Sequence, residues 1–171
     1  MNYSKKTFLS FLLVALFFSS TGIAQKFAHI NSQQLLVDSP LVKTADEQLQ
    51  TFQNGLISKG QDMVKAFETD YQSYVAEVDA GSLNKIQMGQ REAELTKTQE
   101  AIQKYEVEVQ QKIAAKREEL YKPILDKAKV AIDAIGKEGN YTMIFDTGTN
   151  GLLFAVESED ILAQVKAKLG W

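Results

Sequence analysis

Two places in the sequence hold side chains whose types could do chemistry. His29, the only histidine, lies in a short apolar run, where a lone imidazole is more often structural than a base or metal ligand. Asp146, followed by Gly148, Asn150 and Gly151, faintly resembles a metal-binding loop, but it lacks the downstream Glu and the spacing of an EF-hand. We therefore expect a plain turn there, with no metal or cofactor. Because no Ser/His/Asp set or phosphate-binding Gly loop is present either, the sequence predicts a protein that is not an enzyme.

A group of large apolar side chains has the residue types to bind another polypeptide. Aromatic and Met side chains make large, adaptable contacts. The group flanks an Asp-Ala-Gly-Ser turn at 79–82, and its members are Phe67, Tyr71, Tyr74, Val78, Leu83 and Met88. Two interpretations remain open: these residues pack two helices together, or some of them stay exposed as a surface for unfolded chains.

The elements that position this group are two long helices joined at the turn. From Leu41 to Val78 there is no proline, and apolar residues recur at gaps of three and four, which predicts a coiled-coil-like helix. At 1.5 Å per residue this helix would extend for roughly 57 Å. Gly55 and Gly60 each cost about 1 kcal/mol relative to Ala in a helix interior, so we expect a helix that bends readily.

The second long helix should return over residues 83–135. Its contact positions include the polar residues Gln99, Glu106 and Lys116, so we expect a loose seam between the two helices. Pro123 removes one backbone hydrogen bond and crowds the carbonyl four residues earlier, which predicts a kink or a break.

Short segments at both ends of the chain predict a small base. The expected elements are a strand at 27–30, a helix at 33–37 capped by Asn31 or Ser32, strands at 141–145 and 152–156 joined by a Gly-rich hairpin loop, and a last helix capped by residues 158–160. So small a sheet is marginal in water by itself, which favours oligomerisation through the strands. The apolar residues expected at that interface are Phe27, Ile30, Met143, Phe145, Leu152 and Phe154.

The N-terminus and the charge limit the location and the partners. A basic start, an apolar run at 8–18 and small residues at Gly22 and Ala24 predict a secretory signal peptide cleaved after Ala24; an uncleaved membrane anchor is the competing interpretation. Cleavage removes two of the 19 basic residues and none of the 22 acidic ones, which leaves a net charge of −5. A mildly acidic exported protein is not expected to bind nucleic acid.

Two short motifs, with the long helical hairpin between them, resemble a known family. The first is Lys-Phe-Ala-His-Ile-Asn at 26–31, followed by Leu35-Leu36. The second is Tyr-Thr-Met-Ile-Phe-Asp at 141–146, followed by an apolar strand and a Ser-Glu-Asp-Ile-Leu helix start. In this order and behind a signal peptide, the motifs resemble the Skp/OmpH family of periplasmic chaperones for outer-membrane proteins.

The resemblance implies an α+β, mostly α, fold and a jellyfish-like homotrimer. Residues 25–40 and 124–171 would form the base of a single chain, and residues 41–123 a helical arm. Strands of three subunits would form a central barrel, with three arms around a cavity. The implied function is that of an ATP-independent periplasmic holdase for unfolded outer-membrane β-barrel proteins, with a transient contact to the membrane.

The charge of the arm departs from the family pattern. Well-known members look strongly basic, whereas residues 41–120 hold 10 basic and 14 acidic residues. We therefore transfer no lipopolysaccharide site to this chain, and we expect capture to depend on apolar contacts. The alternative function is that of a structural coiled-coil adaptor in an envelope export assembly.

Overall fold

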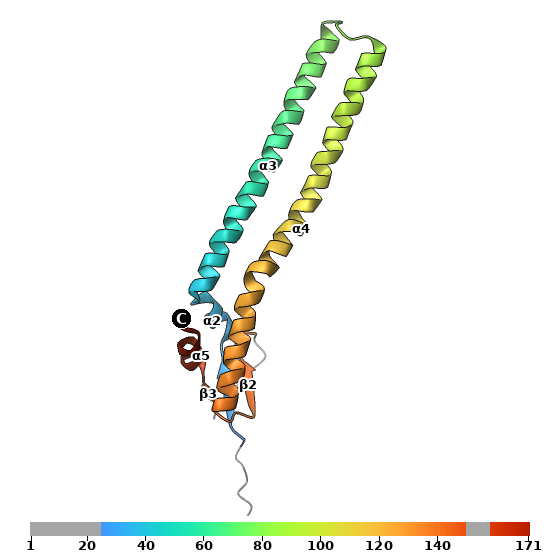
Figure 1. The fold of residues 1–171 in the computed structure, drawn as a ribbon. Coiled ribbons are helices and arrows are strands. Elements are labelled where there is room, and N and C mark those ends of the chain that lie inside the picture. Colours follow the sequence, from blue (N-terminus) through green and yellow to red (C-terminus); the bar gives the residue numbers. More distant parts are fainter. Residues whose placement is uncertain (1–24, 150–157) are drawn as a thin grey trace, which may run out of the picture.

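The computed structural model describes residues 25–149 and 158–171 as a long helical hairpin standing on a small base (Figure 1). In chain order the elements are β1 (Phe27–Ile30), α2 (Ser32–Val37), α3 (Pro40–Asp79), α4 (Lys85–Glu138), β2 (Met143–Asp146), β3 (Glu159–Asp160) and α5 (Leu162–Leu169). The fold is α+β and mostly α, which confirms the predicted class. No helix in the described ranges is long and apolar enough to cross a membrane.

The ends of the two arm helices follow from local sequence signals. Ser39 caps α3, since its hydroxyl accepts a hydrogen bond from the Val42 N–H, and Pro40 occupies the first turn, where no N–H is needed. Gly81 has a φ of +65°, a left-handed conformation that suits glycine, and it confirms the predicted turn. Asn84 and Gln87 form a capping box at the start of α4, which therefore begins two residues later than predicted.

Helix α4 passes through Pro123 without a break, so of the predicted kink or break the break does not occur. A proline removes one hydrogen bond and strains one turn, and the remaining bonds of a 54-residue helix hold it together on both sides. Ile124 and Ala128, just after the proline, are buried, and Ala128 belongs to the core of the base, which further holds the lower part of the helix. The helix curves as it passes from the arm to the base (Figure 1).

The base is a three-stranded sheet in the order β2-β1-β3, with both neighbours parallel to β1. The strand predicted at 141–145 lies at 143–146. Residues 159 and 160 pair with Ala28 and His29 as a strand, which differs from the predicted helix cap; α5 starts after them, with the Leu162 N–H bonded to Asp160. The strand predicted at 152–156 and the last two residues of its hairpin loop, 150–151, lie outside the described residues.

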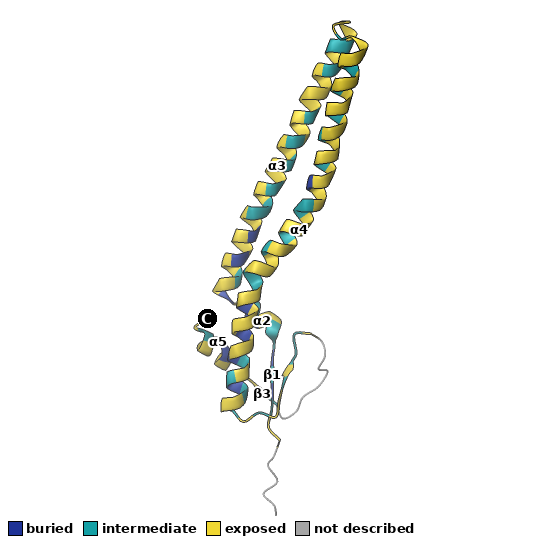
Figure 2. Cartoon of the chain, turned by 45° about the vertical axis from the view of Figure 1, so that its right-hand side comes forward, coloured by how far each residue is buried: buried dark blue, intermediate teal, exposed yellow. Residues whose placement is uncertain are grey.

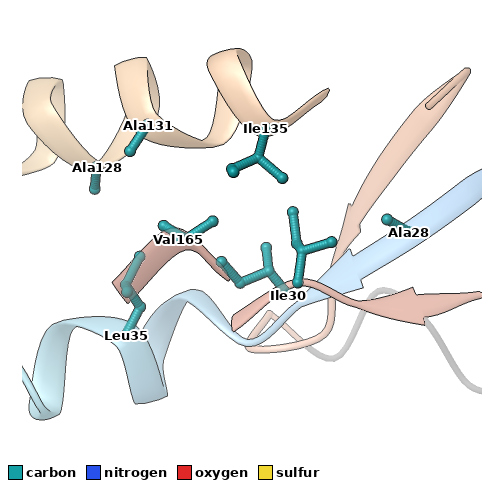
Figure 3. Packing of buried hydrophobic residues seen from close by; sticks show 8 residues of the cluster. Ala28, Ile30, Leu35, Ala128, Ala131, Ile135 and Val165 are labelled. Carbon is teal, nitrogen blue, oxygen red and sulfur yellow. The ribbon is translucent and has the colours of Figure 1, made fainter. Parts of the chain in front are cut away.

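The core of the base lies between β1, α2, the last turns of α4 and α5 (Figure 3). Its buried members are Ala28, Ile30, Leu35, Ala128, Ala131, Ile135, Ile161 and Val165. Alanines at two positions of α4 keep that face of the helix narrow, so it can approach the sheet closely. The alternation of β1 turns Ala28 and Ile30 toward this core and leaves Phe27 and His29 on the other face of the sheet.

Candidate binding surfaces

The two candidate chemical groups have structural partners. His29 Nδ1 lies 2.8 Å from the hydroxyl of Ser158, which links β1 to the segment before β3. Asp146 accepts hydrogen bonds from the Ser32 N–H at 3.1 Å, the Ser32 hydroxyl at 2.6 Å and the Gly148 N–H at 2.9 Å. Asp146 thus ties the end of β2 to the start of α2. Among the described residues no cluster of His, Cys, Asp and Glu could hold a metal ion.

The surroundings of Asp146 shift its pKa. Partial burial raises the pKa, but the hydrogen bonds donated by Ser32 and Gly148 stabilise the carboxylate, and the pKa lies below its usual value as a result. The ionised form of Asp146 is therefore the one that holds α2 in place.

The apolar group at the turn is divided by the structure. Five members are half-buried between the helices: Phe67, Tyr74, Val78, Leu83 and Met88. Tyr71 is the exposed one, and its ring stacks on Phe67 with 6.3 Å between centroids. The Tyr74 hydroxyl donates to Glu92 of the opposite helix at 2.6 Å. Packing of the hairpin accounts for most of this group; its role in binding a partner stays a prediction.

A more exposed apolar stripe runs along α3 and was missed by the sequence analysis. Ile57, Val64 and Tyr71 are 54%, 41% and 51% exposed. Their spacing of seven residues places them on one side of the helix, since two turns of a helix span about seven residues. Ile57 and Val64 directly follow the half-buried residues Leu56 and Met63, which face the seam. The seven-residue repeat of these apolar residues could have predicted the stripe. It was not recognised because the apolar residues of this helix were assigned to the seam alone.

Two of the hollows on the described part of the arm include aromatic and branched aliphatic side chains. The upper hollow, with a volume of about 570 Å³, lies between α3 and α4, and Ile57, Val64 and Tyr105 are among the residues that line it. The lower hollow, of about 900 Å³, lies along α4, where it includes Ile113 and Tyr121. Figure 2 shows that most residues of the arm are exposed. Both hollows are open to solvent.

Tyr105 lines the upper hollow and is buried, although the predicted seam had Glu106 and not Tyr105 as its contact position. Its hydroxyl donates to the Leu56 carbonyl at 3.0 Å. Its ring lies 3.5 Å from where a Cβ of Gly60 would stand. Lys59 and Lys112 approach the same ring, with Nζ at 5.3 and 5.7 Å from its centroid. Gly60 therefore does more than let the helix bend, because the absence of a side chain at this position leaves room beside Tyr105.

The outer face of the sheet carries a second exposed apolar surface. The register pairs Phe27 with Met143 and His29 with Phe145, so these side chains share the face opposite the core. Met143 is 56% and Phe145 38% exposed, and the rings of Phe27 and Phe145 lie 6.1 Å apart.

The remaining predicted interface residues are placed differently. Ile30 is only 2% exposed and belongs to the core of the chain, which corrects its assignment to an intersubunit surface. The physical reason is the alternation of β1, which turns Ile30 away from the face of Phe27. Leu152 and Phe154 lie outside the described residues.

Comparisons with known proteins agree with this architecture. A family model described as outer membrane protein (OmpH-like) matches residues 26–169. A crystal structure from Caulobacter crescentus CB15, described as a candidate outer membrane chaperone (OmpH-like), is similar with a TM-score of 0.73 and 16% identity. The similarity covers 85% of this chain and 83% of the other, and at that identity it shows the fold alone. No match was found among curated proteins.

Proposed function

Because the chain belongs to the OmpH-like family, for which a chaperone role is supported, we propose that it is an ATP-independent holdase that binds unfolded outer-membrane β-barrel proteins in the periplasm. The family is non-enzymatic. The hydrogen bonds of His29 and Asp146 connect segments of the base, which is a structural role for both residues. The expected signal peptide at 1–24 would deliver the protein to that compartment.

The observation that carries the proposal is the exposed apolar surface on a long, open arm. Helix α3 has 40 residues and α4 has 54. In the arm, between Pro40 and Pro123, the buried residues of these helices are only Ala45, Leu49 and Tyr105. An arm needs no exposed Ile, Val and Tyr side chains to form a hairpin, whereas a surface that holds unfolded chains does. Apolar contacts of this kind are individually weak and adaptable.

Assembly would multiply these contacts. We propose a homotrimer joined through the outer face of the sheet, with Phe27, Met143 and Phe145 at the interface. Three arms around one cavity would raise the effective concentration of apolar surface near a captured chain, so weak contacts would sum to tight holding. The 14 acidic and 10 basic residues of segment 41–120 offer no attraction to acidic clients.

The proposal is tested by dilution of a urea-unfolded outer-membrane β-barrel protein into buffer with and without this chain, while light scattering reports aggregation. We expect suppression of scattering without ATP, and little change between about 0.1 and 1 M salt, because salt screens charges and leaves apolar contacts intact. Aggregation at the same rate in the presence of a molar excess of the folded protein would show that it is no holdase for this class of client.

The adaptor function has no specific observation in its favour. An adaptor arm needs a regular seam and a defined docking tip. In this hairpin the seam is interrupted by polar residues, and the apolar surface lies along the arm and not at a single point.

A further inference from the structure

We propose that the upper hollow of the arm is a binding subsite for apolar side chains of an unfolded client, and that the side of the hairpin carrying it faces the client. This inference rests on the proposed holdase function and assigns it to named residues. The hollow side is defined here by Ile57, Val64 and Tyr71 of α3 together with the two hollows.

The hollow has the construction of a side-chain pocket. Ile57 and Val64 of α3 line it with exposed side chains, and Ile102 and the buried Tyr105 line it from α4. Gly60 contributes no side chain, so the space above the ring stays open. The Tyr105 hydroxyl donates a hydrogen bond to the Leu56 carbonyl, which holds the ring in place. Tyr105 itself is only 7% exposed, so Ile57 and Val64 supply most of the exposed apolar surface of the hollow.

The two sides of the hairpin differ in character. Lys59 and Lys112 approach the Tyr105 ring, but neither lines the hollow, and helical spacing places both on the side of the seam opposite Ile57 and Glu106. Lys112 also pairs with Glu108 at 3.2 Å. At this height one side of the hairpin therefore carries the two lysines, and the other carries Ile57 and Val64 among charges of both signs.

The charge around the hollows indicates the occupant. Three basic and four acidic side chains line the two hollows, so the charges almost cancel; these are Lys65, Arg117, Lys122, Glu68, Glu106, Glu118 and Asp126. A surface without net charge selects neither acidic nor basic segments. It suits the strand segments of outer-membrane barrels, in which lipid-facing apolar residues alternate with polar ones and supply one apolar edge.

Site-specific photo-crosslinking tests the assignment. The photoreactive residue benzoylphenylalanine replaces Val64 on the hollow side or, as the matched control, Val107, which is 61% exposed, follows a hollow-lining residue in the sequence and does not line the hollow. The probe is a urea-unfolded outer-membrane β-barrel protein diluted onto the full chain. We expect a several-fold higher crosslink yield from position 64, and equal yields would overturn the assignment.

A binding measurement is the second part of the test. The Ile57→Ser, Val64→Ser double variant should bind the same unfolded barrel roughly tenfold more weakly, since two apolar contacts are lost, whereas Val107→Ser should bind like the parent. Circular dichroism and sedimentation of all variants should match the parent. Equal weakening by Val107→Ser would overturn the subsite while leaving the holdase function in place. If the parent fails to keep the barrel protein soluble, both the subsite and the holdase function are refuted.

Discussion

At the residue scale, Tyr105 shows how one side chain can join two helices whose seam has polar residues at several contact positions. A buried phenol needs a hydrogen-bond partner, and the Leu56 carbonyl supplies it across the hairpin. The ring then covers the backbone at Gly60, where any side chain would have narrowed the gap. The pair Gly60–Tyr105 thus joins the two helices near the middle of the arm.

The hydroxyl of Tyr105 gives a direct prediction for stability. Tyr105→Phe should lower the free energy of unfolding by about 1 kcal/mol, the usual net contribution of one hydrogen bond. The matched control is Tyr71→Phe, because the structure shows no hydrogen bond of the Tyr71 hydroxyl in the described chain. Urea denaturation followed by circular dichroism measures both. A loss of equal size in the control would contradict the role of the hydrogen bond.

Asp146 predicts how the base responds to acid. Its folded pKa lies below the unfolded value of about 3.9, so its contribution to stability is complete above that pH and is lost as the pH falls toward the folded pKa. Asp146→Asn keeps the shape and removes the titration, so this variant should lose less stability than the parent between pH 6 and about pH 3. Urea midpoints across that range test it, and identical pH profiles would contradict it.

At the element scale, signals within a few residues predicted most boundaries. Ser39-Pro40, the turn at Gly81 and the alternation of 27–30 each specify their own geometry, and α3 lies within one residue of its predicted range. The two-residue strand β3 could not be predicted in this way, because Glu159 and Asp160 have low strand propensity and pair only after α4 returns the chain to β1.

The candidate site was predicted less completely than the fold for a related reason. Apolar spacing in α3 fits both a seam and a neighbouring exposed stripe, and the sequence does not say which residues α4 covers. Tyr105 was missed because it sits one step off the assumed heptad, and its burial depends on Gly60 of the other helix. Which side of a hairpin stays open is a property of the pair of helices.

Both prolines of the sequence lie where the arm meets the base: Pro40 starts α3, and Pro123 precedes the buried Ile124 of α4. We expect the arm to move as a body about this level. Pro123→Ala restores one helical hydrogen bond and should stiffen the joint. The sequence has no cysteine, so Ser82→Cys gives a single spin-label position at the arm tip. Intersubunit distance distributions should be narrower for Pro123→Ala, and equally broad distributions would contradict a joint at this proline.

At the scale of the whole molecule, the described residues of the base cover only one face of its sheet. Its core lies on one side of β1, among α2, α4 and α5, and Phe27, Met143 and Phe145 remain on the other side. An exposed apolar face of this kind is typical of a surface that binds another protein. The arm adds little to this core, because its apolar residues lie along the hairpin and pack there. A second layer from other copies of the chain would complete the base.

This argument predicts that Phe145→Asp breaks the assembly. The substitution would place an unpaired charge in an apolar interface, at a cost of several kcal/mol per subunit. The matched control is Ile86→Asp, which makes the same kind of change at an exposed position at the arm tip, far from the sheet. Sedimentation should show a trimer for the parent and for Ile86→Asp, and smaller species for Phe145→Asp. Because the core of each chain faces away from Phe145, the helical circular dichroism of the arm should survive the loss of assembly. A well-folded monomeric parent at micromolar concentration would contradict both the trimer and the role assigned to this face.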